Sequence, residues 1–186
     1  PFDGRVQLTV GGRLQQLTGK GFDYVPGSPT FGGATSRYDD GAVSPAVALL
    51  VKPTEHLSIY GNYVEALIAP PVAPITASNA GQVFAPIVAD QKEVGVKYDF
   101  GAVGTSLSFF EINRPNARQD AATLRYAVDG LQRNRGVEFN LLGEPPPGVR
   151  LLGGLTPIDP RMVKTAGGAF DGKAAPGVPA MTLNLY

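Results

Sequence analysis

The 186 residues are enough for one domain with a sizeable core. Sixteen lysine and arginine residues balance sixteen acidic residues, so the chain lacks the basic excess that nucleic-acid-binding proteins usually carry. The absence of cysteine excludes a disulfide framework and thiolate metal sites, and no apolar run is long enough for a membrane helix.

Apolar and polar residues alternate with period two along the whole chain, which predicts β-strands. In the first segment, Val6, Leu8 and Val10 share one face of the predicted strand, and Gln7 and Thr9 share the other. We expect eight strands, near residues 4–17, 42–52 and 57–67, two within 91–116, and near 135–143, 149–156 and 179–186. The fold class predicted from this pattern is all-β, an antiparallel meander in which each strand pairs with the next.

The predicted connections alternate between short and long. Those after the second, fourth and sixth strands are the short segments "PTEH", "GAVG" and "EPPPG", whose proline and glycine suit tight turns. Those after the other strands are long, for example residues 19–41, 68–90 and 159–177. Transmembrane β-barrels have short periplasmic turns and long extracellular loops, so the alternation favours a transmembrane barrel over a soluble β-sandwich.

A barrel wall has one face toward lipid and one toward its lumen. The lipid-facing set is predicted to be Val6, Leu8, Val10, Leu57, Ile59, Val94, Val96, Val137 and Phe139. The predicted lumen-facing set is Gln7, Thr9, Ser58, Tyr60, Asn62, Glu93, Lys97, Glu138 and Asn140. Aromatic residues near strand ends would suit the interfacial girdles: Tyr60, Tyr63, Tyr98, Phe100, Phe109 and Phe110. For Arg133 and Arg135, the pattern leaves the lumen and the lipid interface both open.

The sequence contains no convincing motif for a catalytic site. The segment from Gly167 to Lys173 has the glycine spacing of a phosphate-binding loop, but Ala174 follows the lysine where Ser or Thr would hold Mg²⁺. His56 is the only histidine and lies in a predicted turn, and Asp39-Asp40-Gly41 is expected to be a plain loop turn. We therefore expect no catalytic residue, no metal site and no cofactor.

Several segments together resemble a known family. "VSPAVALLVKPTEHLSIYGNYVEAL", "QKEVGVKYDFG", "FFEINRPN", "DGLQRNRGVEFNLLGEPPPGVRLLGG" and "GGAFDGKAAPGVPAMTLNLY" resemble successive hairpins of TonB-dependent outer-membrane receptors of the ferric-siderophore group. The resemblance implies an outer-membrane barrel of about 22 strands around a plug domain, and TonB-energised uptake. Because eight strands are too few and no plug is visible, we interpret residues 1–186 as a partial, internal segment of the barrel domain.

The resemblance implies three partners: outer-membrane lipid, a ferric siderophore as transported ligand, and the TonB system acting through the missing plug. Ligand candidates lie in the predicted loops, where aromatic rings could contact a siderophore and arginines could attract an anionic ferric complex: Phe22, Tyr24, Phe31, Arg37, Tyr38, Phe84 and Arg118. Packing of the loops against one another would explain the same aromatics.

Two other functions stay open from the residues alone. One is a small structural or adhesive outer-membrane barrel, since eight strands can close on themselves. The other is a soluble β-sheet binding domain. Small inward residues such as Ser58, Gly95 and Ser106 argue against a packed small barrel, so we expect an open, curved sheet whose first and last strands lie far apart.

Overall fold

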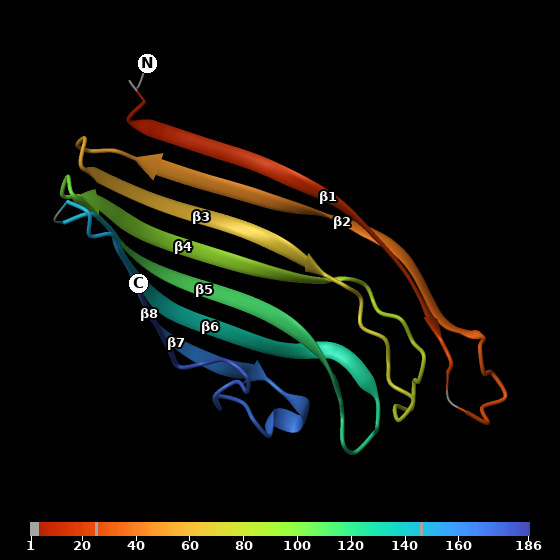
Figure 1. The fold of residues 1–186 in the computed structure, drawn as a ribbon. Helices are drawn as coiled ribbons and strands as arrows, with labels where there is room; N and C mark the ends of the chain where they lie inside the picture. Colours follow the sequence, from red (N-terminus) through yellow and green to blue (C-terminus); the bar gives the residue numbers. More distant parts are fainter. Residues whose placement is uncertain (1–3, 25, 146) are drawn as a thin grey trace.

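The computed structural model describes residues 4–24, 26–145 and 147–186. Eight strands form one antiparallel sheet in a single curved layer (Figure 1). Their bounds are β1 Val6–Phe22, β2 Ala34–Val51, β3 Leu57–Ile68, β4 Ile87–Asp99, β5 Val103–Gln119, β6 Tyr126–Gly143, β7 Leu151–Lys164 and β8 Met181–Leu185. Within these ranges the single helical element is a 3-10 turn, η1 Ala166–Gly168, and no helix is both long and apolar enough to cross a membrane.

The spatial order of the strands follows their order in the chain, from β1 at one edge to β8 at the other. Every neighbouring pair is antiparallel, which confirms the predicted meander of consecutive hairpins. Across the described residues, β1 pairs with β2 alone and β8 with β7 alone. The sheet is therefore not closed, and the prediction of an open, curved sheet is confirmed.

The register places the apolar residues of successive strands side by side. Val94 lies opposite Gly61 of β3 and Phe109 of β5, and Phe109 lies opposite Val137 of β6. Directly opposed residues of an antiparallel pair point to the same face, so this face is continuous across the sheet. We call it the outer wall. The opposite face, which carries Glu93, Ser108 and Glu138, is the inner wall.

The two walls differ in exposure because the sheet is curved. On the outer wall Leu8 and Val10 are 67% and 71% exposed, whereas on the inner wall Ser44 and Ser108 are 5% and 4% exposed. Side chains splay apart on a convex face and crowd together on a concave one. The exposures therefore identify the apolar outer wall as the convex face, as predicted.

No second layer of the described chain covers the outer wall. The buried apolar residues are Ala73, Ala77, Ile87 and Ala175, and three of the four lie in loops. A soluble sandwich would instead bury the apolar faces of two sheets packed about 10 Å apart. An extended apolar wall without a protein partner is the arrangement of a barrel wall whose partner is lipid.

Several strands are longer than the sequence pattern predicted. β2 begins at Ala34 instead of near Ala42, and β6 begins at Tyr126 instead of near Arg135. The prediction stopped where apolar alternation stopped, but backbone pairing continues through polar residues once the hairpin has been started. As a result, Asp39, Asp40 and Gly41 lie within β2 instead of a loop turn.

The predicted alternation of loop lengths is only partly right. Residues 23–33, 69–86 and 165–180 are long connections at one end of the sheet, but β5 and β6 are joined there by residues 120–125 alone (Figure 1). The opposite end carries the turns at 52–56, which contains His56, and at 100–102, where Gly101 adopts a positive φ of 87°. Two residues of the predicted connections, Val25 and Pro146, lie outside the described residues.

Candidate functional site: the two walls and the loop end

The seven residues of β3, β4 and β6 that were predicted to face a lumen share the inner wall. Asn62 of β3 lies opposite Glu93 of β4, and Ser58 lies opposite Lys97. Tyr60 lies opposite Gly95 of β4, which lies opposite Ser108 of β5. Ser108 in turn lies opposite Glu138 of β6. Asn140 lies opposite Ser106. The register thus gathers two carboxylates, an ammonium group and several amide and hydroxyl groups on one concave surface.

On the part of this surface formed by β3 and β4, Tyr60 is hydrogen-bonded to Glu93. Its hydroxyl donates to Glu93 Oε1 at 2.5 Å, and Gln91 Nε2 donates to Glu93 Oε2 at 3.2 Å. The ring lies across Gly95, where a Cβ atom would come within 2.7 Å of the ring Cζ. The ammonium of Lys97 lies 5.1 Å from the ring centroid, a cation–π distance. Glycine at position 95 is therefore required for the ring to lie flat on the wall.

A second polar group lies beside it on β6. Asn140 Nδ2 donates to Glu138 Oε1 at 2.7 Å and approaches Ser106 Oγ at 3.4 Å. Carboxylates that are ionised accept hydrogen bonds only, so Glu93 and Glu138 keep free acceptor positions toward the concave side. Within the described residues, no group of three or more His, Cys, Asp or Glu side chains is arranged to hold a metal ion.

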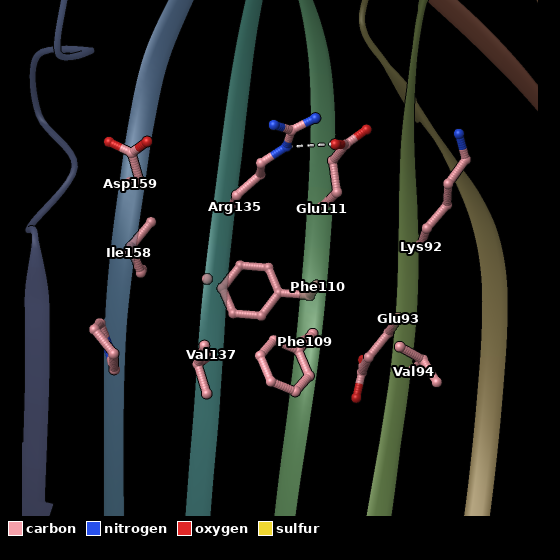
Figure 2. Close-up of a pocket in the computed structure, with 12 residues that line it drawn as sticks. Lys92, Glu93, Val94, Phe109, Phe110, Glu111, Arg135, Val137, Ile158 and Asp159 are labelled. Carbon is pink, nitrogen blue, oxygen red and sulfur yellow. Dashed lines mark hydrogen bonds and ion pairs between the residues drawn. The ribbon is translucent and has the colours of Figure 1, made fainter.

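The side chains of the outer wall change from apolar to charged toward the loop end of the strands. The row Val94, Phe109, Val137 and Pro157 is apolar, whereas the row two residues nearer the loop end is charged: Lys92, Glu111, Arg135 and Asp159. Figure 2 shows the four charged side chains at one level across β4 to β7, next to the apolar side chains. A groove of about 700 Å³ runs between the two rows. Arg135 Nε donates to Glu111 Oε2 at 2.7 Å.

The register decides the question that the sequence left open for two arginines. Arg135 lies opposite Glu111, and Arg133 lies opposite Asn113, so both arginines share the outer wall with Val137. Both therefore lie on the outer wall toward the loop end, and not on the inner wall. Conversely, Tyr60 and Phe110 lie on the inner wall, opposite Gly95 and Gly136, so their assignment to a lipid-interface girdle was wrong.

Three of the predicted ligand contacts gather at the tip of the β1–β2 hairpin. The ring centroids of Phe22 and Tyr24 are 6.4 Å apart, and those of Tyr24 and Phe31 are 6.3 Å apart. All three rings are exposed. Asp23 orders the tip, because its carboxylate accepts hydrogen bonds from Ser28 Oγ and from Thr30 Oγ1. The tip therefore presents three neighbouring aromatic rings to solvent.

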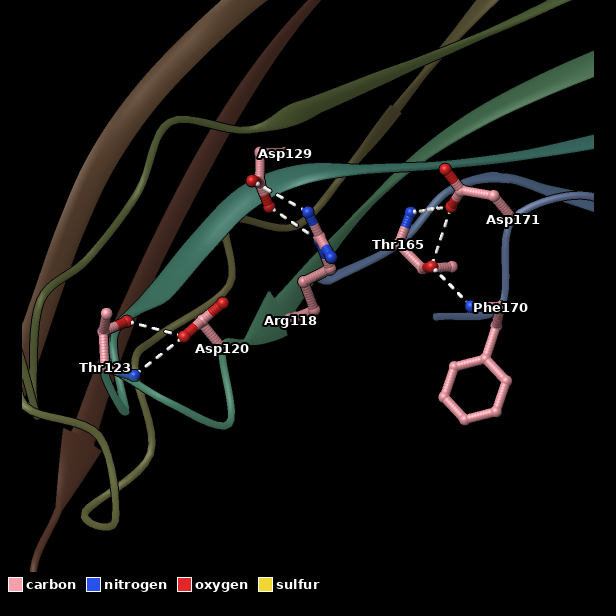
Figure 3. A network of polar contacts seen from close by, with 7 residues as sticks. All are labelled: Arg118, Asp120, Thr123, Asp129, Thr165, Phe170 and Asp171. Atoms are coloured by element: carbon pink, nitrogen blue, oxygen red, sulfur yellow. Dashed lines mark hydrogen bonds and ion pairs between the residues drawn. The ribbon is translucent and has the colours of Figure 1, made fainter. Parts of the chain in front are cut away.

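The other predicted contacts lie elsewhere. Tyr38 lies over Gly19 on the inner wall, and Arg37 lies opposite Lys20 on the other face of β2. Arg118 is held by Asp129 through two hydrogen bonds of 2.8 and 3.0 Å (Figure 3). Within the described residues the Arg37 guanidinium has no hydrogen-bond or ion-pair partner. A paired guanidinium attracts a further anion less strongly than a free one, so Arg37 is the better placed of the two arginines.

Phe84 belongs to a contact between two loops that the sequence did not reveal. Its ring packs edge-on against Tyr126, with centroids 5.8 Å apart. Asn79 binds the backbone of Tyr126 twice, through Nδ2 to the carbonyl and through Oδ1 from the amide, both at 2.9 Å. Ser78 donates from its amide to the carbonyl of Leu124 at 2.9 Å. The loop 69–86 is thereby docked on the β5–β6 connection.

Two further loop turns are held by single aspartates (Figure 3). Asp120 accepts from the amide and the hydroxyl of Thr123 at 2.8 and 2.9 Å. These hydrogen bonds hold the pKa of Asp120 below its ordinary value. Asp171 accepts from the amide and hydroxyl of Thr165, whose Oγ1 in turn accepts from the Phe170 amide. The loop end is thus ordered by local polar contacts.

The family model for the TonB dependent receptor-like β-barrel matches residues 1–186. This chain belongs to that family. Proteins of the TonB-dependent receptor family are receptors and transporters of the bacterial outer membrane, so the predictions of outer-membrane location and of no enzymatic activity are confirmed. Proteins of this family carry no cofactor. A ferric siderophore counts as a transported ligand and not as a cofactor.

Two relatives within the TonB-dependent receptor family are similar in sequence. The ferrichrome receptor FcuA of Yersinia enterocolitica is 41% identical over 182 residues, which are 95% of this chain and 23% of that protein. The ferric preacinetobactin receptor BauA of Acinetobacter baumannii is 38% identical, with a TM-score of 0.80 over 98% of this chain and 27% of that one. The siderophore receptor PiuA of the same organism also reaches 0.80 over 97% of this chain and 28% of that one, but at 21% identity it supports the fold alone. The chain spans about a quarter of the length of these relatives.

Proposed function

We propose that residues 1–186 form consecutive strands in the barrel domain of an outer-membrane receptor that takes up a ferric siderophore. The observation that carries the proposal is the pairing of an apolar convex wall with a polar concave wall in one open sheet of a TonB-dependent receptor barrel. The hydrocarbon core of a membrane has no hydrogen-bonding groups, so the unpaired edges of β1 and β8 need neighbouring strands there. The proposed receptor supplies them as a larger barrel.

The polar inner wall supports a plug domain as its partner. Glu93 and Glu138 expose carboxylate acceptors on the concave face, and Lys97 and Asn62 supply donors beside them. These groups suit a partner that brings backbone amides and basic side chains. In the proposed mechanism the TonB system pulls on such a plug from the periplasm, which opens a path for the ligand along this wall.

The loop end supplies the proposed ligand-binding surface. The aromatic tip of Phe22, Tyr24 and Phe31 can contact the apolar faces of a siderophore, and Arg37 can attract an anionic ferric complex. The siderophore itself is left unassigned, because relatives of similar identity are named for different ligands, ferrichrome for FcuA and ferric preacinetobactin for BauA. The proposal therefore names the class, ferric siderophores.

A transport assay tests this function. The intact receptor containing residues 1–186 is expressed in cells that lack their own siderophore receptors, and uptake of radiolabelled iron is measured with a panel of ferric hydroxamates and catecholates. We expect uptake of at least one complex, and we expect it to stop when TonB is deleted while binding to the cell surface persists. Uptake that continues unchanged without TonB, or no uptake of any complex, would contradict the proposal.

A further inference from the structure

The inner wall of β3 to β7 has a second level, between the row of Glu93 and Phe110 and the ion pair of Arg118 with Asp129. We call this level the upper inner wall. Alternate residues of a strand share a face, so Arg114 of β5 lies on it with Phe110, opposite Gln132 of β6. Of the described residues that the register places on the upper inner wall of these five strands, Arg114 alone carries a charge.

The charge of Arg114 is free on the concave side. The side chain is exposed, and within the described part of the chain its guanidinium has no hydrogen-bond or ion-pair partner. Glu93 lies opposite Phe110, and the backbone from Phe110 to Arg114 covers about 14 Å. This separation exceeds the screening length of about 8 Å at physiological ionic strength. The carboxylates of the inner wall therefore neutralise little of this charge.

Amide groups and an aromatic ring lie on the same wall as Arg114. Gln132 Nε2 donates to Asn134 Oδ1 at 3.0 Å, and within the described residues Asn134 Nδ2 keeps its own hydrogens without a partner. The ring of Phe110 lies across Gly136, where it leaves no room for a Cβ atom (Figure 2). Arg114, Asn134 and Phe110 thus offer a positive charge, a hydrogen-bond donor and a flat apolar face. These groups suit a large anion that carries oxygen atoms and rings.

We propose that Arg114 binds the ferric complex where it enters the lumen, and that it makes the receptor selective for anionic complexes. The inference rests on the proposed function and adds the charge of the ligand to it. Fe³⁺ held by three singly charged hydroxamates is neutral, whereas Fe³⁺ held by three doubly charged catecholates is a trianion. Arg114 attracts the trianion, and the carboxylates of Glu93 and Glu138 repel it. The two effects together hold the complex on the loop side of the carboxylates until the receptor opens.

Equilibrium binding to the purified intact receptor tests the role of Arg114. The probes are a radiolabelled neutral ferric tris-hydroxamate and a radiolabelled anionic ferric tris-catecholate from the uptake panel. We expect the wild type to bind the anionic complex more tightly. Arg114→Gln should raise the Kd of the anionic complex about tenfold, because a hydrogen bond between charged groups is lost, and should leave the Kd of the neutral complex unchanged.

Two further readouts separate a charge effect from a structural one. Arg114→Lys keeps the positive charge and should restore most of the affinity for the anionic complex. In the wild type, added salt should raise the Kd of the anionic complex, because the interacting charges are exposed. The same addition of salt should have a smaller effect in Arg114→Gln.

The matched control is Arg133→Gln. Arg133 follows Gln132 in β6 but lies on the outer wall, so its loss removes an equal charge at the same level and should change neither Kd. Equal losses for both complexes in Arg114→Gln, no loss for the anionic complex, or an equal loss in the control would overturn the proposal. Uptake confined to neutral complexes would also overturn it and leave the proposed function standing, whereas uptake of no complex would contradict both.

Discussion

The two walls of strands β3 to β6 are built from the same backbone but are stabilised in different ways. On the outer wall Ile59, Val94 and Val96 are exposed, and in the proposed barrel it is hydrocarbon that covers them. On the inner wall Tyr60 and Glu93 are joined by hydrogen bonds within the protein. In the proposed barrel, one face of this sheet is therefore stabilised by transfer into lipid, whereas the other is stabilised by specific hydrogen bonds between its own side chains.

The comparison extends to glycine. Gly61 is on the outer wall and Gly95 on the inner wall, in adjacent strands. A Cβ atom at Gly61 would meet only the Glu93 carbonyl oxygen, at 3.6 Å, whereas one at Gly95 would crowd both Tyr60 and Ser108. The inner wall is therefore specified in shape as well as in polarity.

The largest effect is expected for a charge on the lipid-facing side. Val96→Arg should lower the free energy of unfolding of the intact barrel in lipid vesicles by about 2–4 kcal/mol, because an arginine is placed near the middle of the apolar span. Denaturant titration measures the loss. The control Thr18→Arg, on the outer face of β1 beyond its apolar stretch, should be close to neutral. Equal effects at the two positions would mean that the walls are assigned wrongly.

A smaller loss should follow from crowding the inner wall. Gly95→Ala places a Cβ atom within 2.7 Å of the Tyr60 ring and 2.8 Å of Ser108 Cβ. Overpacking of this kind costs about 1–3 kcal/mol, and the same titration measures it. Gly61→Ala is the matched control and should cost nothing measurable, because the added Cβ atom would make an ordinary 3.6 Å contact and glycine is no better than alanine inside a strand. If both alanines are tolerated equally, the flat position of the Tyr60 ring is not required.

Removing one hydroxyl from the inner wall should have a still smaller effect. Tyr60→Phe loses the hydrogen bond to Glu93 but keeps the ring, so we expect a destabilisation of about 1 kcal/mol. Tyr98→Phe serves as the control, since within the described residues the Tyr98 hydroxyl has no partner. A loss for Tyr98→Phe as large as that for Tyr60→Phe would show that the hydrogen bond is not the cause.

The smallest effect concerns the loop end, where neither lipid nor the inner wall contributes. The folded-state pKa of Asp120 lies below its unfolded value, so its stabilisation of the turn is present above the unfolded pKa and is lost as the pH falls through the folded pKa. Amide exchange protection at Ala122 and Thr123 should therefore decrease as the pH is lowered below about 4. Asp120→Asn should abolish this pH dependence. A wild-type turn whose protection is constant down to pH 2 would exclude the carboxylate as its support.

The strands were predictable because period two is a local signal. Alternation between near neighbours is enough to predict both a strand and its apolar face, as for Val6, Leu8 and Val10 or for Val94 and Val96. The strand ends were less predictable. β2 and β6 extend through polar residues such as Arg37 and Asp129, where the hydrophobic pattern had already ended and only hydrogen bonding to the paired strand continues.

The candidate sites show the same division. The inner-wall residues Tyr60, Glu93 and Glu138 could be named from alternation, and the aromatics of the β1–β2 tip from their position in a predicted loop. The contact between Asn79 and Tyr126 had no sequence signal, because the two residues are 47 positions apart. The Asn79 side-chain amide hydrogen-bonds to both backbone groups of Tyr126, and no residue pattern indicates such a bond. The ion pair between Arg118 and Asp129 could not be predicted either, because it depends on how β5 and β6 are paired.

The sequence by itself determined the strand class, the order of the hairpins and the chemistry of each face, since all three follow from interactions between near neighbours. Only the tertiary structure decided which wall carries Arg133 and Arg135, how far the strands extend, and which loops contact each other. Those features depend on the register between strands. Register is set by the sum of hydrogen bonds and side-chain contacts along a whole pair, and a shift of one residue would move every side chain to the opposite wall.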